Sequence, residues 1–366
     1  MSNMKKNEFK TNEMLWSPSK NRIENTSLYN FIKHVNSNYK TKINNFLGLH
    51  NWSVNSRGDF WNEVWDFYKI IGDKGNKPYL DPENNLPGTQ FFPNGKLNFA
   101  ENMLKKNNSD SAIIFWSEDK IKKRVNWFEL RNQVSAVANY LKNKGIKSGD
   151  RVAAYLPNMP ETIIVMLATA SIGAIFSSAS PDFGVEGVLD RFGQIEPKIL
   201  VTTDGYNFNG KEINIIKKVN DVVKSLQSVE ETILVPLINS NEINNIKNSI
   251  LYKDLLKEYA SKNLEFEKLS LSHPLYIMFS SGTTGKPKCI VHSAGGVLLK
   301  HLVEVGLHSN AMDNKKFFYF TTCGWMMWNW LVSSLMLNAT VCLYDGSPFY
   351  PNSDILWTYA EEEKFN

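Results

Sequence analysis

The sequence predicts an α/β protein built from doubly wound sheets with helices on both faces. From residue 111 onward, short apolar runs alternate with longer amphipathic segments, the pattern of repeated strand–helix–strand units. Apolar strands joined by helices imply right-handed crossovers and a parallel sheet that is covered on both faces. The length of 366 residues is enough for about two domains.

The N-terminal part is expected to form two units before this fold begins. Residues 1–34 are polar and rich in Asn and Lys, and we expect a loosely ordered leader. Residues 35–104 are aromatic and punctuated by Gly and Pro, and FWNEVWDFYKII (60–71) places aromatic residues at helical spacing. This second unit is predicted to be a cap that packs on the main domain, residues 105–366.

The elements of the main domain follow in order. Strands are expected at residues 112–116, 151–157, 174–178, 198–204, 232–237 and 274–279, and helices at 127–145, 160–173, 185–195 and 211–226. Gly145 stands where a residue after a helix C-cap belongs, and Pro160 suits the first turn of the next helix. Ligands of such sheets bind beyond the carboxyl ends of the strands, so we expect the site in the loops that follow them.

Charge and cysteine content exclude several classes of function. Lys and Arg number 41 and Asp and Glu 37, and the basic residues are scattered, so the net charge of +4 does not support a nucleic-acid partner. The three cysteines, at 289, 323 and 342, have no C-x-x-C spacing, and the six histidines are dispersed. This predicts no metal site and no disulfide framework, and favours a reducing compartment.

Two long uncharged stretches must be weighed as membrane spans. Residues 162–181 are interrupted by Gly173 and several serines, and residues 317–344 by an Asn-Ala-Thr segment. Interrupted runs of this kind are typical of buried helices and strands, and the second is predicted to form strand, loop, helix and strand. The first residues also lack the apolar core of a secretory signal. We therefore expect no membrane span and a cytoplasmic protein.

The segment FSSGTTGKPK (279–288) carries the clearest chemistry. It follows an apolar strand, and its glycines leave backbone N–H groups open to an anion while hydroxyls and ammonium groups add donors. Pro287 prevents a helix directly after the loop, and the spacing differs from the P-loop pattern. The alternative is a solvated linker. We predict a loop that holds the phosphates of ATP through Ser280, Ser281, Gly282, Thr283, Thr284, Gly285, Lys286 and Lys288.

This loop resembles the phosphate loop of the adenylate-forming superfamily, which includes the AMP-forming acyl-CoA synthetases. The segment TTCGWMMWNWLVSSLMLNATVCLYDGSPFYP (321–351) is similar to the branch that activates acetoacetate. Further similar segments are KGIKSGDRVAAYLPNMPE (144–161), HSAGG (292–296) and, in a cap of the acetyl-CoA-synthetase type, residues 57–70 and 86–104. The resemblance covers nearly all of residues 35–366.

The resemblance implies a two-step ligation of a carboxylic acid to coenzyme A. The carboxylate attacks the α-phosphate of ATP, pyrophosphate leaves, and the coenzyme A thiolate then displaces AMP from the acyl-adenylate. Such displacements at phosphorus depend on positioning and charge neutralisation, so Mg²⁺ is expected with the phosphates. The expected partners are small molecules: acetoacetate, ATP and coenzyme A. No oligomeric state follows from the sequence.

The resemblance also implies residues for the acid and for coenzyme A. Trp325, Met326 and Met327 fall where the family places its acyl pocket, and their side chains would form an apolar wall. Trp328 or Asn329 is a hypothetical donor to the 3-oxo group; simple packing in the core is the alternative for each of these residues. Lys211 stands near the position where relatives hold the coenzyme A phosphates, although it is also expected to be a solvated residue at a helix start.

The family pattern continues beyond residue 366, so we expect this chain to be a truncated large N-terminal domain of an adenylate-forming enzyme. The catalytic lysine of the family is expected beyond that residue, and no catalytic residue is assigned. We expect residues 1–366 alone not to catalyse adenylation at a normal rate. Three hypotheses remain: part of an acetoacetate ligase, part of a ligase for acetate, propionate or another short acid, or a nucleotide-binding remnant without catalysis.

Overall fold

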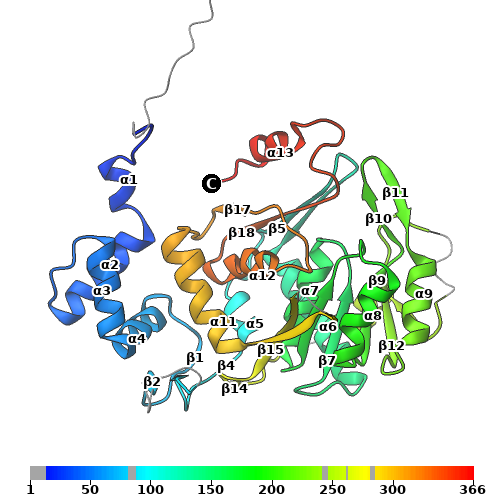
Figure 1. Cartoon of the computed structure of the whole chain (residues 1–366), viewed down its shortest axis with the longest axis horizontal. Coiled ribbons are helices and arrows are strands. Elements are labelled where there is room, and N and C mark those ends of the chain that lie inside the picture. The colour runs from blue at the N-terminus through cyan, green and yellow to red at the C-terminus, as the bar shows by residue number, and fades with distance from the viewer. Residues whose placement is uncertain (1–13, 81–87, 241–245, 261–262, 281–284) are drawn as a thin grey trace, which may run out of the picture.

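A computed structural model describes residues 14–80, 88–240, 246–260, 263–280 and 285–366 of the chain. These residues form a seven-stranded and a four-stranded sheet at the centre, with smaller pairings at the edges (Figure 1). The large sheet has the order β13-β12-β9-β7-β8-β15-β16. Its strands are β7 Arg151–Tyr155, β8 Ile175–Ala179, β9 Ile199–Thr203, β12 Glu231–Val235, β13 Ser249–Leu251, β15 Pro274–Ser280 and β16 Lys288–Ser293.

The large sheet is doubly wound, as predicted. Its described strands pair in parallel, apart from β16, which is antiparallel to β15. The chain runs from β7 to β8 on one side and then crosses back to β9 on the other side. Because crossovers between parallel strands are right-handed, this reversal places α7 and α8 on opposite faces of the sheet.

The two faces of the large sheet belong to separate hydrophobic clusters. Val152 and Ala154 of β7 join the main cluster, whereas Ala153 and Tyr155 point into a second one. The main cluster contains α6 Trp127–Asn143, α7 Pro160–Ser171, α10 Tyr252–Glu258 and α11 Ala294–His301, and the second contains α8 Val185–Ile195 and α9 Ile216–Ser225. The chain after α11 continues as a π-helix, η2 Leu302–His308.

The four-stranded sheet has the order β17-β18-β5-β6. Its strands are β17 Lys316–Phe318, β18 Thr340–Asp345, β5 Ser111–Ser117 and β6 Ile121–Asn126. Between β17 and β18 the chain forms α12 Met326–Val332 and the 3₁₀ helix η3 Ser333–Leu337, which confirms the predicted strand, loop, helix and strand. Helix α13 Ile355–Glu363 covers the outer face, where Tyr359 stacks on Trp116.

Helix α7 accounts for the first long uncharged stretch. All of its residues are buried, and it contacts β5 of one sheet and β7 of the other. A helix enclosed between two sheets must be apolar on every side, which explains the composition without a bilayer. Nowhere in the described part of the chain does a helix combine the length and apolar character needed to cross a membrane.

The N-terminal elements pack on the main cluster. They are α1 Lys20–Glu24, α2 Ser27–Tyr39, α3 Phe46–Asn55, α4 Arg57–Phe67, α5 Phe99–Met103 and the short strands β1 Gly72–Asp73, β2 Tyr79–Leu80, β3 Gln90–Phe91 and β4 Lys96–Leu97. Strand β14 Leu269–Ser270, from later in the chain, pairs with β4. Helix α2 runs through the expected boundary at residue 34 and buries Phe31, Ile32 and Val35. Residues 27–34 are therefore part of the folded body rather than a loose leader, because three apolar residues at helical spacing outweigh the polar composition.

One predicted helix is wrong in its first part. Residues 211–226 were expected to be helical throughout, but Lys211–Asn214 is strand β11, which pairs with β10 Gly205–Phe208, and α9 begins only at Ile216. The turn of this hairpin consists of Asn209 and Gly210, which both have positive φ values of 52° and 76°. An Asn-Gly pair is the strongest sequence signal for such a turn, and it outweighs the helical pattern here.

Candidate functional site

The carboxyl ends of three neighbouring strands meet at one edge of the large sheet. The connections after β7 and β8 lead to α7 and α8, which pack on opposite faces, and ligands of doubly wound sheets bind beyond such strand ends. Strand β15 is parallel to β8 and lies next to it. The link that contains Asn158, the loop that starts with Ser180 and the strand end at Ser280 therefore lie side by side.

The described part of the predicted phosphate loop lies between strands β15 and β16. Ser280 ends β15, and its Cα partner across the hairpin is Lys288, the first residue of β16. Gly285 has a φ of 87° and open space around it, and the chain after Pro287 continues as strand β16, which agrees with the expectation that no helix follows directly. The other predicted phosphate ligands, Ser281, Gly282, Thr283 and Thr284, lie outside the described residues.

The end of the phosphate loop contacts α8. The ammonium group of Lys286 lies 3.6 Å from a carboxylate oxygen of Asp190, and the side chain is largely exposed. Nε2 of Gln194 donates to the carbonyl of Pro287 at 2.8 Å. An exposed ion pair contributes little free energy, so a bound polyphosphate can draw Lys286 away from Asp190.

The predicted acyl wall stands beside the carboxyl end of β8. The hydroxyl of Ser178 donates to the carbonyl of Cys323 at 2.5 Å, which fastens the segment that leads to Trp325. Trp325 precedes α12 and is 66 % exposed, an unusual fraction for an indole. Met326 and Met327 form the half-buried first turn of the helix. The structure thus brings wall and phosphate loop to adjacent strand ends.

The two proposed donors to a 3-oxo group differ in their surroundings. Trp328 is fully buried against Phe176, and its Nε1 donates to Oδ1 of Asn158 at 2.9 Å. This donor is already used, so the hypothesis that Trp328 donates to the substrate is wrong. Asn329 is also buried, and its backbone carbonyl accepts a hydrogen bond from Ser333 at 2.9 Å.

Asn158 and Asp345 are site residues that the sequence interpretation missed. Nδ2 of Asn158 donates to the carbonyls of Thr321 and Tyr344, both at 3.1 Å, and its backbone N–H donates to Oδ1 of Asp345 at 3.0 Å. The available signal was position: Asp345 ends β18 and Asn158 lies in the short link after β7, at the carboxyl ends of apolar strands where sites occur.

Asp345 faces a cavity of about 240 Å³ between the two sheets. Burial raises the pKa of its carboxyl to about 7, and the charges of Asp182 and Glu118 add to this, while the N–H of Asn158 opposes it. Asp182 also lines the cavity, whose other walls include Phe208 and Phe320. Two carboxyl groups between aromatic rings suit an uncharged ligand segment with hydrogen-bond donors better than a phosphate.

Lys211 lies on the hairpin and is exposed. The hairpin turn is fastened to the other sheet by Glu118, whose carboxylate accepts hydrogen bonds from the backbone N–H groups of Asn209 and Gly210 at 2.6 and 2.9 Å. Among the described residues, no hydrogen bond or ion pair joins Lys211 to the phosphate loop. Nor do the described residues contain a group of three or more His, Cys, Asp or Glu side chains that could hold a metal ion.

Comparison with known proteins shows that most of this chain is similar to acetoacetyl-CoA synthetases. An acetoacetyl-coenzyme A synthetase of Rhizobium meliloti (strain 1021) is 49 % identical over 353 residues, which are 96 % of this chain and 54 % of the relative. An acetoacetyl-CoA synthetase of Gallus gallus is 42 % identical over 359 residues, again 96 % of this chain and 54 % of the relative. The solved acetoacetyl-CoA synthetase from Streptomyces lividans superposes with a TM-score of 0.91 at 35 % identity, and the match covers 96 % of this chain and 54 % of that one.

The chain spans about half the length of these relatives. The model of one family, described as AMP-binding enzyme, matches residues 99–366, which is most of the chain and includes both sheets, the phosphate loop and the acyl wall. The chain belongs to the AMP-binding enzyme family.

Proposed function

We propose that this chain takes part in the ATP-dependent ligation of acetoacetate to coenzyme A, with an acyl-adenylate as the intermediate and AMP and pyrophosphate as products. The observation that carries the proposal is the adjacency of the phosphate loop, at the end of β15, and the wall of Trp325, Met326 and Met327, beside the end of β8. The similarity to acetoacetyl-CoA synthetases over 96 % of the chain supports the choice of acid.

The roles of the residues follow from their chemistry. Ser280, Gly285, Lys286 and Lys288, with the loop residues 281–284, would hold the β- and γ-phosphates while a carboxylate oxygen of the acid attacks the α-phosphorus and pyrophosphate departs with the electron pair. Mg²⁺ would enter with these phosphates, whose oxygens are its usual ligands. The thiolate of coenzyme A would then attack the acyl carbon, and AMP would leave.

The acid site would be an apolar wall for a short acyl chain. Trp325 is exposed, the two thioethers are partly exposed, and Asn329 lies one helical turn after Trp325. Lys211, exposed on its hairpin, would serve the phosphates of coenzyme A. A cytoplasmic setting is part of the proposal, because the three cysteines are all free thiols and two of them are buried.

The test is exchange of labelled pyrophosphate into ATP by purified protein that contains these residues. We expect exchange that depends on acetoacetate and that exceeds the exchange with acetate or propionate by at least about tenfold, the discrimination that one or two additional contacts provide. Higher exchange with acetate or propionate would favour the alternative short-acid ligase. ATP binding without any acid-dependent exchange would favour a nucleotide-binding module.

The phosphate loop has its own control. Lys286→Ala combined with Gly285→Val should abolish exchange and weaken ATP binding. Valine disfavours the positive φ of Gly285, and the ammonium group is lost. Lys300→Ala is the matched control, since Lys300 is an exposed lysine whose ion-pair partner, Glu304, lies on the next turn of its own helix. Unchanged ATP affinity in the double variant would overturn the assignment of the loop.

A further inference from the structure

Asn158 occupies the switch point of the large sheet. It lies in the short link between β7 and α7, and only 2 % of its surface is exposed. Every hydrogen-bonding group of its side chain has a partner: Nδ2 donates twice, to the carbonyls of Thr321 and Tyr344, and Oδ1 accepts from Nε1 of Trp328. A buried amide that is satisfied in this way is rigid, because any rotation would break several bonds without access to water.

Two partners of Asn158 lie on either side of the acyl-wall residues in the sequence. Thr321 lies four residues before Trp325, and Trp328 directly follows Met327. The segment that holds Trp325, Met326 and Met327 is thus fixed at both ends to one side chain. The third bond, to Tyr344, and the bond from the backbone N–H to Asp345 connect the same point to the end of β18.

We propose that Asn158 is the positioning residue of the acid site, and that it determines the selectivity for the acid by holding both ends of the segment 321–328. The inference rests on the proposed function. Asparagine is suited to this role because its amide both donates twice and accepts once; aspartate keeps the acceptor for Trp328 but loses both donors. The phosphate loop has separate supports, Gln194 and Asp190 on α8, so Asn158 acts on the acid and not on ATP.

The first experiment measures KM for acetoacetate and for ATP in pyrophosphate exchange by Asn158→Ala, Asn158→Asp and Trp328→Phe. We expect the KM for the acid to rise at least about five- to tenfold in each variant, because each removes at least one hydrogen bond that fixes the segment, and the KM for ATP to change less than about twofold. Asn158→Ala combined with Trp328→Phe should be no worse than the poorer single variant, because both remove the same bond.

Asn98 supplies the matched control. It is buried to the same extent, and its Nδ2 donates to three backbone carbonyls, of Ala170, Ser171 and Glu267, at the other end of α7. Asn98→Ala should lower the stability as Asn158→Ala does, yet leave the ratio of the two KM values unchanged. Equal changes of this ratio in the Asn98 and Asn158 variants would mean that Asn158 acts only through stability, which overturns the inference.

A second readout does not depend on catalysis. The indole N–H resonance of Trp328, assigned by its loss in Trp328→Phe, should shift upfield in Asn158→Ala and remain near its place in Asn158→Asp. An unmoved resonance in Asn158→Ala would overturn the inference even if the exchange assay is normal. If the unaltered protein shows no exchange with any acid, the proposed function fails, and the resonance still decides whether Asn158 holds the segment.

Discussion

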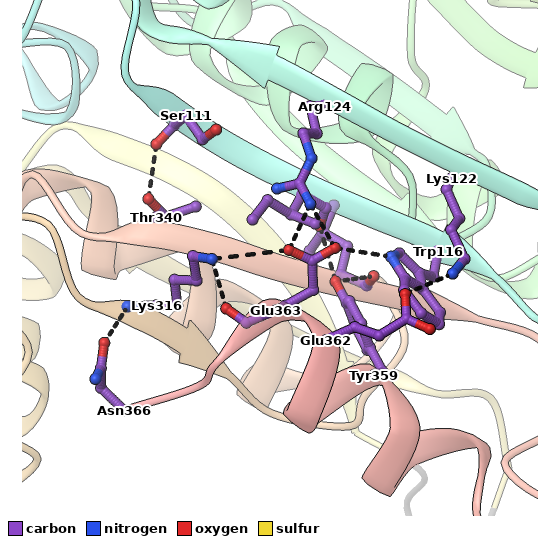
Figure 2. A network of polar contacts seen from close by, with 12 residues as sticks. Ser111, Trp116, Lys122, Arg124, Lys316, Thr340, Tyr359, Glu362, Glu363 and Asn366 are labelled. Atoms are coloured by element: carbon purple, nitrogen blue, oxygen red, sulfur yellow. Dashed lines mark hydrogen bonds and ion pairs between the residues drawn. The ribbon is translucent and has the colours of Figure 1, made fainter.

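The carboxylate of Glu363 accepts hydrogen bonds from one guanidinium nitrogen of Arg124 at 2.7 and 2.6 Å, although 239 residues separate the two in the chain (Figure 2). Nε1 of Trp116 donates to the same carboxylate at 3.2 Å, and the ammonium group of Lys316 lies 3.7 Å from it. Figure 2 shows these side chains converging between α13 and strands β5, β6 and β17. Helix α13 is therefore fastened to three strands at its last turn.

The two partners of this ion pair are predicted to differ in importance. The Glu363 side chain is 4 % exposed and that of Arg124 is 55 % exposed. Arg124→Ala leaves a buried carboxylate with weaker partners and should lower the free energy of unfolding by about 2–4 kcal/mol. Glu363→Gln leaves a guanidinium that water can solvate, and should cost only about 1–2 kcal/mol.

Urea unfolding of the two variants checks this order. The control is Glu362→Gln, because Glu362 pairs with Lys122 at 2.8 Å and both side chains are about half exposed, at 51 % and 49 %. This variant should change the free energy of unfolding by less than about 0.5 kcal/mol. Equal losses of unfolding free energy in Arg124→Ala and Glu362→Gln would show that the burial of Glu363 does not affect stability.

Trp325→Ala is expected to separate function from stability. The indole is mostly exposed, so its removal should change the free energy of unfolding by less than about 1 kcal/mol. If the indole forms the acyl wall, acid-dependent exchange should fall at least about tenfold. Trp357, which is 76 % exposed on α13, is the control: Trp357→Ala should leave both quantities unchanged. A similar fall in exchange for both variants would contradict the assignment of Trp325.

Asp345 predicts a pH dependence of stability. Its pKa is raised from 3.8 to about 7 by burial and by the neighbouring carboxylates. Between these pH values the folded protein keeps a proton on Asp345 that the unfolded chain has lost. The contribution of the neutral Asp345 carboxyl to the free energy of unfolding is therefore fully present below about pH 4 and is lost as the pH rises through about 7. Asp345→Asn should therefore be more stable than the unaltered protein at pH 8, by on the order of 2 kcal/mol, with little difference at pH 4. Identical pH profiles from urea unfolding would contradict the raised pKa.

The hairpin turn offers a test of close packing. Gly210 has a φ of 76°, and a Cβ atom there would lie 2.4 Å from the ring of Tyr350. Gly145 has nearly the same φ, 78°, with no atom within 4 Å of its Cβ position. Gly145→Ala should cost about 1 kcal/mol of backbone strain, and Gly210→Ala distinctly more, because Tyr350 must also move. Equal thermal stability of the two variants would mean that Tyr350 can move aside without loss of stability.

The periodic parts of the fold could be predicted from the sequence. Apolar runs such as residues 151–157 and 274–279 became central strands, and Pro160 begins α7 as expected. The hairpin of β10 and β11 was missed because the helical pattern was followed through its Asn-Gly turn. The boundary at residue 34 was missed because composition was weighed above the spacing of Phe31, Ile32 and Val35.

The candidate site divides in the same way. The phosphate loop could be proposed from the sequence because its chemistry lies within one short segment, and Ser280 at its start does end strand β15. Asn158 could not be found in this way, since its partners Thr321, Trp328 and Tyr344 are more than 160 residues away in sequence. A residue whose role depends on long-range contacts leaves no local pattern. For the same reason Trp328 seemed free to donate to a substrate until its partner was known.

The position of β18 between β5 and β17 imposes an order on the synthesis of this protein. Ser111, at the start of β5, pairs with Thr340, 229 residues later. At about 5–20 residues per second, a ribosome needs about 10–45 s to make this stretch. The strands of the large sheet are complete by residue 293, whereas β5 and β6 must wait with an open edge and an uncovered apolar face. During that interval the nascent hairpin of β5 and β6 presents the open strand edge and apolar surface that favour aggregation and that chaperones bind.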